Sequence, residues 1–448
     1  MNITDFLVKV SDVVCGTPFF LLLIGGGLFF LIYSGFVPFR YFGRAIKALS
    51  VKSEGEGQIS SYQALASAVA ATVGMGSIAG VAVAIMMGGP GAIFWIWISA
   101  CVGMATKFFE GTLAIMYKGK DSKGETQGGP MYLITTALGS KWRPLAVFFS
   151  IFGLIGSLCM WQANQLTEAV TSVFTTPMGI ENTPLLRLII GVVICLIVAS
   201  VILGGINRIS KIASKLVPLM VVGYFILVGY ILITNASAIP DVFKAIFSEA
   251  FSFKAGFGGF IGVAFIGARR AALVNEAGIG TASMMHGASK NSEPVREGLV
   301  AMLGPAIDSG LICTLTALAI LVNWDPASMN EGLKGIEVAM NSFEASIPGA
   351  GGYLLMFMVL IFAFSTMFSY SYYGMKCTSF IFGADKSKYY NYFFLIMLIV
   401  AAMIPLTAVV AIIDLAIVFM AIPTMFTMFV MAPKVKEAMK IYFAKDKK

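Results

Sequence analysis

The residues most suited to chemistry lie in an apolar stretch, residues 61–87, whose centre is interrupted by Gly74 and Gly76. Each glycine weakens a helix by about 1 kcal/mol relative to alanine. Inside a bilayer, backbone groups freed by a break are tolerated only where protein or a water-filled cavity satisfies them. The hydroxyls of Thr72 and Ser77 flank this break. The pattern favours an ion or substrate site of a secondary transporter, the alternative being a glycine face packed on another helix.

A second apolar stretch, residues 255–281, is interrupted by Gly262 and Gly267. Its second half contains four polar or charged residues: Arg269, Arg270, Asn275 and Glu276. Ionisable residues inside a membrane are costly and usually face a cavity or a partner. The pattern predicts a second broken helix, unless the span ends near Gly267 and the charges lie outside the bilayer.

Membrane-spanning helices must position these residues. The 448-residue chain is 58% hydrophobic and 12% charged, whereas soluble domains contain about twice that charged fraction. Eleven segments are long and apolar enough to span a bilayer: residues 15–37, 61–87, 91–117, 146–173, 188–205, 216–234, 255–281, 298–323, 351–375, 389–408 and 410–432. We therefore predict an all-α integral membrane protein with a single transporter domain, residues 1–448.

The distribution of positive charge predicts the topology. The odd-numbered connections and the C-terminal tail contain 23 lysines and arginines. The N-terminal tail and the even-numbered connections contain five: Lys9, Arg187, Lys244, Lys254 and Lys334. Because positive charge marks the cytoplasmic side, we expect the N-terminus outside and the C-terminus in the cytoplasm. This topology explains the net charge of +8 without a nucleic-acid partner.

The two interrupted spans are the second and the seventh, five spans apart. Spans 2–6 (residues 61–234) and 7–11 (residues 255–432) then form two halves of opposite topology, with residues 15–37 as an extra N-terminal helix. Interrupted helices at matching positions of inverted halves are the best sequence indication of a transporter site. We predict a five-plus-five inverted repeat.

Other classes of function have little support. The six cysteines are isolated in or beside apolar runs, as is typical of small core residues, and the single histidine, His286, offers no metal cluster. No nucleophile elbow, phosphate-binding loop or zinc motif is present, so we expect no enzyme and no cofactor. A channel is less favoured because no repeated ring of charge occurs.

Two connections have amphipathic character. Residues 38–49 mix aromatic and basic side chains, as an interfacial cytoplasmic helix does. Residues 331–345 place apolar side chains near the helical period, which predicts an external amphipathic helix, either a lid or a plain surface helix.

Several motifs resemble one known family, the alanine or glycine:cation symporters. Residues 74–82 are similar to its G-T-G-N-I-A-G-V-A stretch. Further similar motifs follow in the family's order: Gly128-Gly129-Pro130-Met131-Tyr132, Gly204-Gly205-Ile206 with Arg208-Ile209, Arg270 through Asn275-Glu276-Ala277-Gly278, and Ala363-Phe364-Ser365-Thr366 with Tyr372-Tyr373-Gly374. The resemblance implies the five-plus-five fold of sodium-coupled amino-acid transporters and uptake of small amino acids. Four residues depart from the family pattern near the site: Met75, Ser77, Ala271 and Val274.

On this resemblance, the first break would bind the substrate's carboxylate. A half-helix that begins near Met75, Gly76 and Ser77 presents free N–H groups and a positive dipole end. Carbonyls freed near Thr72 would suit the ammonium group.

The seventh and fourth spans would complete the substrate site. We expect freed carbonyls at Phe265 and Ile266, and Asn275 nearby. In the fourth span, Asn164 and Gln165 belong to a polar cluster with Trp161 and Gln162. Asn164 and Gln165 would bond either the substrate or a neighbouring helix.

By analogy with the fold, the sodium ligands would be five oxygens. They are the carbonyls of Ala70, Val73 and Phe362 and the hydroxyls of Ser365 and Thr366. The alternative is that these hydroxyls bond only within their own helix.

Other charges fall inside predicted spans, among them Asp308, Lys107 and Glu110. Asp308 lies midway in the eighth span, and we expect it to pair with Arg269 or Arg270, with a proton carrier as the alternative. Replacing it by asparagine should then leave an arginine unmatched and destabilise the protein. Lys107 and Glu110 are one turn apart in the third span, and we expect them to reach the membrane surface as a pair.

The sequence therefore predicts a sodium-coupled symporter that brings alanine or glycine into the cell by alternating access. A proton-coupled amino-acid carrier is the alternative. The expected partners are the amino acid, sodium and the lipid bilayer, without an obligate protein partner.

Overall fold

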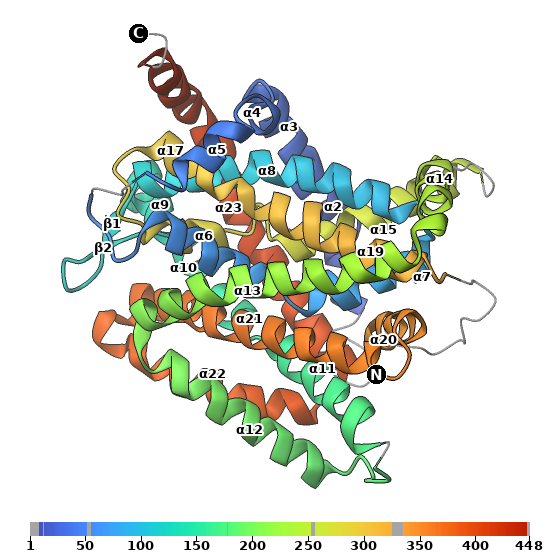
Figure 1. Ribbon diagram of the computed structural model, residues 1–448. Helices are drawn as coiled ribbons and strands as arrows, with labels where there is room; N and C mark the ends of the chain where they lie inside the picture. Colours follow the sequence, from blue (N-terminus) through green and yellow to red (C-terminus); the bar gives the residue numbers. More distant parts are fainter. Residues whose placement is uncertain are drawn as a thin grey trace.

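A computed structural model describes most of the chain and is almost entirely helical (Figure 1). The described residues are 9–11, 13–51, 55–176, 178–251, 256–324 and 335–445, without the side chains of residues 256–261, 269 and 273. Apart from the antiparallel pair β1 (Gly119–Lys120) and β2 (Thr126–Gln127), the regular elements of these residues are helices.

The first part of the chain forms an apolar helix and a short amphipathic pair. The apolar helix consists of α2 (Thr17–Phe20), η1 (Leu21–Gly25) and α3 (Gly26–Tyr33), and α4 (Val37–Arg40) and α5 (Phe42–Ala48) follow. Exposed Phe39, Phe42 and Ile46 lie beside Arg40 and Arg44 on this pair. A helical segment thus occurs where an interfacial helix was expected.

The next elements cover the predicted first repeat. They are α6 (Ser61–Thr72), η2 (Gly76–Gly80), α7 (Val81–Gly88), α8 (Ala92–Met116), α9 (Pro130–Leu133), η3 (Ile134–Leu138), η4 (Ser140–Trp142), α10 (Arg143–Gly156), α11 (Met160–Val170), η5 (Thr171–Thr175), α12 (Pro184–Ile202) and α13 (Gly205–Thr234). The start of α6 is fixed by a capping box in which Ser60 and Gln63 satisfy each other's backbone N–H groups.

The remaining elements cover the predicted second repeat. They are η6 (Ala236–Ala238), α14 (Ile239–Ala250), α15 (Gly256–Asn275), α16 (Thr281–Gly287), α17 (Pro294–Ala301), α18 (Leu303–Pro305), η7 (Ala306–Ile312), α19 (Cys313–Leu321), α20 (Gly335–Ser346), α21 (Gly351–Phe382), η9 (Ala384–Lys386), α22 (Ser387–Met403) and α23 (Leu406–Lys445). The described part of the predicted amphipathic helix is α20; residues 331–334 lie outside the described residues.

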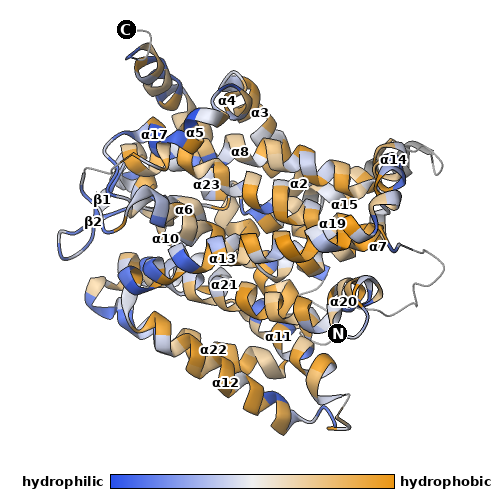
Figure 2. Ribbon diagram, in the orientation of Figure 1, coloured by the Kyte–Doolittle hydropathy of each residue, from blue (hydrophilic) through white to orange (hydrophobic). Residues whose placement is uncertain are grey.

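Membrane-spanning character is confirmed. Among the described residues, seven helices are long and apolar enough to cross a membrane, or eight if α6 and the bent segment 76–88 count as one span. Figure 2 shows apolar residues along the outer helices α12, α13 and α22, and many of their large apolar side chains are exposed. The helices at the other predicted spans do not meet the same test, so eleven spans remain a prediction, as does the inverted repeat.

The contacts between connections agree with spans that alternate in direction. At one end of the helices, Lys118 Nζ donates to the carbonyls of Glu56 and Ser289, and the Ala384 N–H donates to Ser122 Oγ. These residues belong to the first, third, seventh and ninth connections, all odd-numbered. Figure 1 places β1, β2 and the start of α17 at this end.

The even-numbered connections meet at the other end. Trp95 Nε1 donates to the Ala250 carbonyl at the end of α14. Gly335 at the start of α20 packs so closely on Ala79 that a Cβ there would lie 2.5 Å from the Ala79 carbonyl oxygen. Figure 1 shows α7, α14 and α20 together at this end. The first, third, seventh and ninth predicted connections thus lie at the opposite end of the helices from the sixth and eighth.

Candidate functional site

The predicted interruption of the second span is confirmed. Helix α6 ends at Thr72, the chain continues in extended conformation at Val73 (φ −72°, ψ 93°), and a π-helical turn starts at Gly76. The two half-helices meet at 56°. Because Val69 to Thr72 end the first half and Gly76 starts the second, carbonyls and N–H groups are freed on both sides of the break.

The break lies directly against α21. A Cβ on Gly74 would lie 2.6 Å from Thr366 Oγ1, so glycine is needed for this close approach. The hydroxyl of Thr366 is 3.2 Å from the Ala70 carbonyl oxygen and 3.0 Å from that of Phe362. The hydroxyl of Ser365 is 3.3 Å and 2.9 Å from the same two oxygens.

Four of the five oxygens expected as sodium ligands therefore lie together. They come from two helices far apart in sequence, and Ser365 and Thr366 are almost completely buried. Each hydroxyl also contacts a carbonyl of its own helix, which is the alternative considered for them. Both hydroxyls also contact the Ala70 carbonyl on α6, so they do not bond only within their own helix. Val73 is fully buried at the same break.

The second break occurs later than expected. Helix α15 is continuous from Gly256 to Asn275, and the chain leaves helical geometry at Glu276, Gly278 and Gly280, with φ of 53°, 88° and 101°. The interruption predicted at Gly262 and Gly267 is therefore wrong.

Because the second break lies later in the chain, Phe265 and Ile266 lose the free carbonyls for which they were predicted as substrate ligands. Phe265 and Ile266 lie inside the intact helix, where backbone carbonyls are engaged. The freed backbone groups belong to residues 276–280 instead. Asn275, also predicted as a ligand, is buried at the last position of α15, and its Oδ1 accepts from the Ala277 N–H.

Glu276 is the first residue of this second break. Its Oε2 accepts a 2.6 Å hydrogen bond from Thr281 Oγ1, and its Oε1 accepts from Tyr370 of α21. The side chain is 3% exposed. Nearby, the Gly278 N–H donates to Glu110 Oε1 at 2.5 Å. The Glu110 carboxylate thus satisfies one backbone N–H group of the irregular segment.

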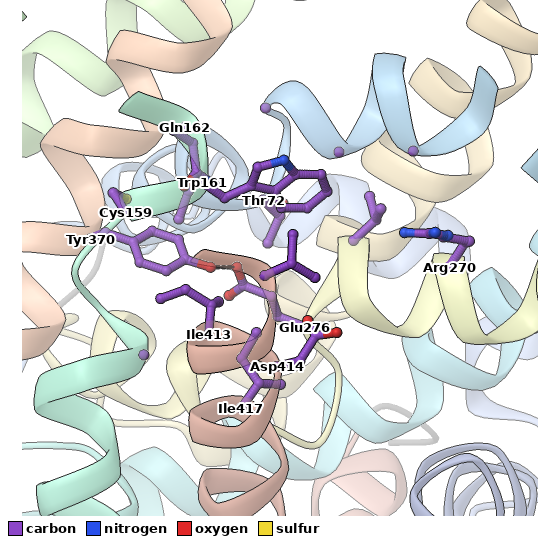
Figure 3. A pocket seen from close by; sticks show the side chains of 17 residues that line it. Thr72, Cys159, Trp161, Gln162, Arg270, Glu276, Tyr370, Ile413, Asp414 and Ile417 are labelled. Carbon is purple, nitrogen blue, oxygen red and sulfur yellow. Dashed lines mark hydrogen bonds between the residues drawn. The ribbon is translucent and has the colours of Figure 1, made fainter. Parts of the chain in front are cut away.

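A cavity lies between the two breaks (Figure 3). It contains about 870 Å³ of empty space, part of it open to solvent. The lining residues are Ala71, Thr72, Gly74, Gly76, Gly80, Gly156, Cys159, Trp161, Gln162, Arg270, Val274, Glu276, Tyr370, Val410, Ile413, Asp414 and Ile417. Figure 3 shows the Glu276 carboxylate among the labelled side chains, bonded to Tyr370.

Three residues predicted to bind substrate line this cavity: Thr72, Gly74 and Gly76. Met75 and Ser77 are buried beside it but are not among the lining residues.

The polar residues of the fourth span divide into two groups. Asn164 donates through Nδ2 to the carbonyls of Ala401 and Ile404, 2.9 and 2.8 Å away at the end of α22. Of the two roles considered for Asn164, the contact between helices is therefore the one observed. Its neighbour Gln165 is buried and does not line the cavity. Trp161 and Gln162, one turn earlier, do line it.

Asp308 is not paired as expected. Its Oδ1 accepts a 2.6 Å hydrogen bond from Ser77 Oγ, and its Oδ2 has no hydrogen-bond partner among the described residues. Asp308 is fully buried in the π-helical turn η7, which packs on η2 and α6. The predicted ion pair with Arg270 is wrong, because η7 presents Asp308 to Ser77. The side chain of Arg269 lies outside the described residues.

The expected surface pair on α8 is also wrong. Lys107 and Glu110 are 3% and 0% exposed, so neither reaches the membrane surface. Glu110 faces the second break, where it binds Gly278. Helix α8 is covered by α15, α16 and α17, and this packing explains why Lys107 and Glu110 are buried.

Sequence reasoning missed the contribution of α23. Val410, Ile413, Asp414 and Ile417 recur at helical spacing and line the cavity. Asp414 is a single carboxylate within an apolar run, and an intramembrane charge is a functional indication by default. That signal could have identified this wall of the site.

A separate buried network lies near the end that contains the odd-numbered connections. Glu297 Oε2 accepts from Ser61 Oγ (2.6 Å), Ser289 Oγ (3.0 Å) and Asn291 Nδ2 (2.9 Å). Its Oε1 lies 2.7 Å from Nδ1 of His286. Glu297 is fully buried. The network joins the start of α6 to α16 and α17, on the side of the two breaks away from α20.

Comparisons with known proteins place the chain in a family. A model described as the sodium:alanine symporter family matches residues 1–448. The sodium/alanine symporter AgcS of Methanococcus maripaludis is 36% identical over 452 residues, covering 99% of this chain and 98% of the relative. The probable sodium/glutamine symporter GlnT of Bacillus subtilis is 31% identical over 457 residues, covering 100% and 92%.

A solved structure supports the fold independently. The crystal structure of MhsT in complex with L-phenylalanine superposes with a TM-score of 0.58 at 14% identity, covering 85% of this chain and 98% of MhsT. This similarity concerns the fold alone. With the family match over the whole chain, the conclusion is that this multi-pass membrane protein belongs to the sodium:alanine symporter family.

Proposed function

We propose that the protein is a sodium-coupled symporter that carries small neutral amino acids, alanine or glycine, into the cell by alternating access. The observation that carries this proposal is the convergence of Ala70, Phe362, Ser365 and Thr366 at the first break. Carbonyl and hydroxyl oxygens are the ligands that hard monovalent cations prefer, and no carboxylate is required. Val73 would supply the fifth oxygen.

The substrate would lie beside this ion, in the cavity between the breaks. Gly74 and Gly76 let the substrate's carboxylate approach the backbone at the start of the second half-helix, where free N–H groups and the positive dipole end favour an anion. Trp161, Val274 and Ile413 provide an apolar wall for a small side chain.

The same reasoning orients the protein in the bilayer. The end where Glu56, Lys118, Ser289 and Ala384 meet contains most of the lysines and arginines of the chain. We therefore place this end, and the C-terminus, in the cytoplasm. The expected location is the cell membrane.

Uptake into liposomes tests the proposal. Purified protein should accumulate labelled alanine or glycine above its external concentration when an inward sodium gradient is imposed. Accumulation driven by a proton gradient alone would instead favour a proton-coupled carrier. Transport that equilibrates but never concentrates the amino acid, whichever gradient is imposed, would favour a channel.

Adding a methyl group at Gly76 should block the substrate site. A Cβ there would lie 3.2 Å from Val274 Cγ2, closer than an ordinary van der Waals contact, and would project into the cavity. We expect Gly76→Ala to abolish alanine uptake while the protein stays monodisperse in detergent. Gly229→Ala in α13 is the control, because a Cβ there would meet no atom within 4 Å and Gly229 does not line the cavity. Normal uptake by Gly76→Ala would contradict the assignment of the site.

Asp308 allows a second coupling ion to be tested. Because no described arginine bonds Asp308, and because Ser77 can still donate to the amide oxygen, Asp308→Asn is expected to keep the melting temperature of the wild type. Under sodium-only coupling it should also keep gradient-driven uptake. If the variant is stable and exchanges alanine but cannot concentrate it, Asp308 carries a proton. A large loss of stability would restore the ion-pair interpretation.

A further inference from the structure

Glu276 combines three properties that are costly for a side chain. It is a carboxylate at membrane depth, it is 3% exposed, and its backbone adopts φ of 53°, a left-handed conformation rare for residues other than glycine. Such strain costs on the order of 1–3 kcal/mol and is typical of functional sites. The other two residues of this segment with positive φ, Gly278 and Gly280, are glycines. Position 276 has a glutamate instead, in spite of the strain.

The carboxylate of Glu276 is held in place but not saturated. Among the described residues, each of its oxygens accepts one hydrogen bond, Oε2 from Thr281 and Oε1 from Tyr370. A carboxylate has about four acceptor positions, so two remain. Because Glu276 lines the cavity, these positions are available to a ligand there (Figure 3).

The charges around Glu276 favour a cationic ligand. The charged groups that act on it are Lys107 and Glu110 of α8, and Asp308 is a third buried carboxylate in the same region. Arg270 and Asp414 also line the cavity, so two cationic side chains lie with four carboxylates within this set of described side chains. Buried charges are normally matched, and a cation that enters the cavity would improve the match.

Two parts of the cavity lining are complementary to the two charges of a zwitterion. One part contains the free N–H groups of the half-helix that starts at Gly76, and these groups favour a carboxylate. Another part of the lining contains Glu276, which favours an ammonium group. Backbone carbonyls alone can bind an ammonium group, but a charged acceptor forms the stronger bond.

We propose that the Glu276 carboxylate accepts hydrogen bonds from the ammonium group of the substrate and thereby makes the site specific for α-amino acids over α-hydroxy acids. Tyr370 and Thr281 act as positioning residues that aim the carboxylate into the cavity. This proposal rests on the function proposed above. It replaces the backbone carbonyls of Phe265 and Ile266 as the expected acceptor.

Competition between alanine and lactate tests the proposal. Lactate keeps the carboxylate and methyl group of alanine but has a hydroxyl in place of the ammonium group. Displacement of labelled alanine from the purified protein, at fixed sodium, gives the affinity of each for the wild type. Direct binding of lactate and alanine to Glu276→Gln gives the same ratio for the variant. We expect the preference for alanine to fall by about 10- to 100-fold in the variant.

A control variant distinguishes direct contact between Glu276 and the substrate from the general electrostatic effect of a buried carboxylate. Glu110→Gln removes an equally buried carboxylate at the same break, but Glu110 does not line the cavity. This variant should keep most of the wild-type preference. An equal fall in both variants would overturn the proposal, as would a folded Glu276→Gln protein that keeps the wild-type preference or loses both ligands equally.

Two further arms keep the test decisive. If Glu276→Gln does not fold, Glu276→Asp retains the charge but withdraws it by one methylene, and it should weaken alanine binding without weakening lactate binding. Equal weakening of both would overturn the proposal. A wild type that binds neither alanine nor glycine would contradict the proposed function itself, which distinguishes the two failures.

Discussion

Replacing Thr366 by alanine is expected to raise the sodium concentration for half-maximal alanine uptake by about tenfold or more. The hydroxyl of Thr366 lies between the carbonyl oxygens of Ala70 and Phe362, 3.2 and 3.0 Å away. Its removal deletes one of five proposed ligands, and a polar contact to a charged group contributes on the order of 1.5–3 kcal/mol. Sodium titrations of uptake in liposomes measure the effect.

Helix α21 offers a matched control for this variant. Thr378 is also buried, and its hydroxyl also bonds the carbonyl four residues earlier, 2.9 Å away on Gly374. It has no contact comparable to the one between Thr366 and Ala70. Thr378→Ala should therefore leave the sodium dependence unchanged. If Thr366→Ala and Thr378→Ala behave alike, the hydroxyl of Thr366 serves its own helix and is not a sodium ligand.

The first break could be predicted because its signal is local. Two glycines one residue apart at the centre of an apolar run weaken the helix wherever the run is placed. The partners of that break on α21 could not be derived in this way. Ser365 and Thr366 lie almost 300 residues away, and their position opposite Ala70 was expected only through the family resemblance.

The second break was misplaced because glycine serves two purposes. A Cβ on Gly267 would meet Trp95 Cβ at 2.9 Å and would also clash with the Ala92 carbonyl, so this glycine allows α15 to pack on α8. Gly278 and Gly280 instead adopt positive φ and end the helix. The sequence shows glycines in both places, and only the neighbouring helix distinguishes close packing from a break.

Charge pairing could not be predicted for a similar reason. Asp308 and Arg270 lie on spans next to each other in sequence, and buried charges are normally matched. Which face of a span receives a side chain depends on local helix geometry, however, and the π-helical turn at Ala306–Ile312 presents Asp308 to Ser77. No pattern in the sequence indicated that turn.

The network around Glu297 gives the largest expected effect on stability. Replacing Glu297 by alanine would remove one acceptor from Ser61, Ser289 and Asn291 and would separate His286 from its carboxylate. Breaking a buried, hydrogen-bonded charge by removing one partner typically costs about 3–5 kcal/mol. We expect the melting temperature in detergent to fall by several degrees. Glu297→Gln keeps the shape of the side chain and one of its oxygens, so its melting temperature should lie between those of the alanine variant and the wild type.

An exposed carboxylate provides the comparison. Glu437 lies 3.4 Å from Lys434 on α23, and both side chains are more than half exposed, so Glu437→Ala should change stability by less than about 1 kcal/mol. Equal melting temperatures for Glu297→Ala and Glu437→Ala would contradict the role given to the network. Because Glu297 holds the start of α6 on α16 and α17, its loss should also loosen α6 at the proposed cytoplasmic end. The proposed sodium ligands at the other end of α6 keep their contacts, so the sodium dependence of any remaining uptake should stay that of the wild type.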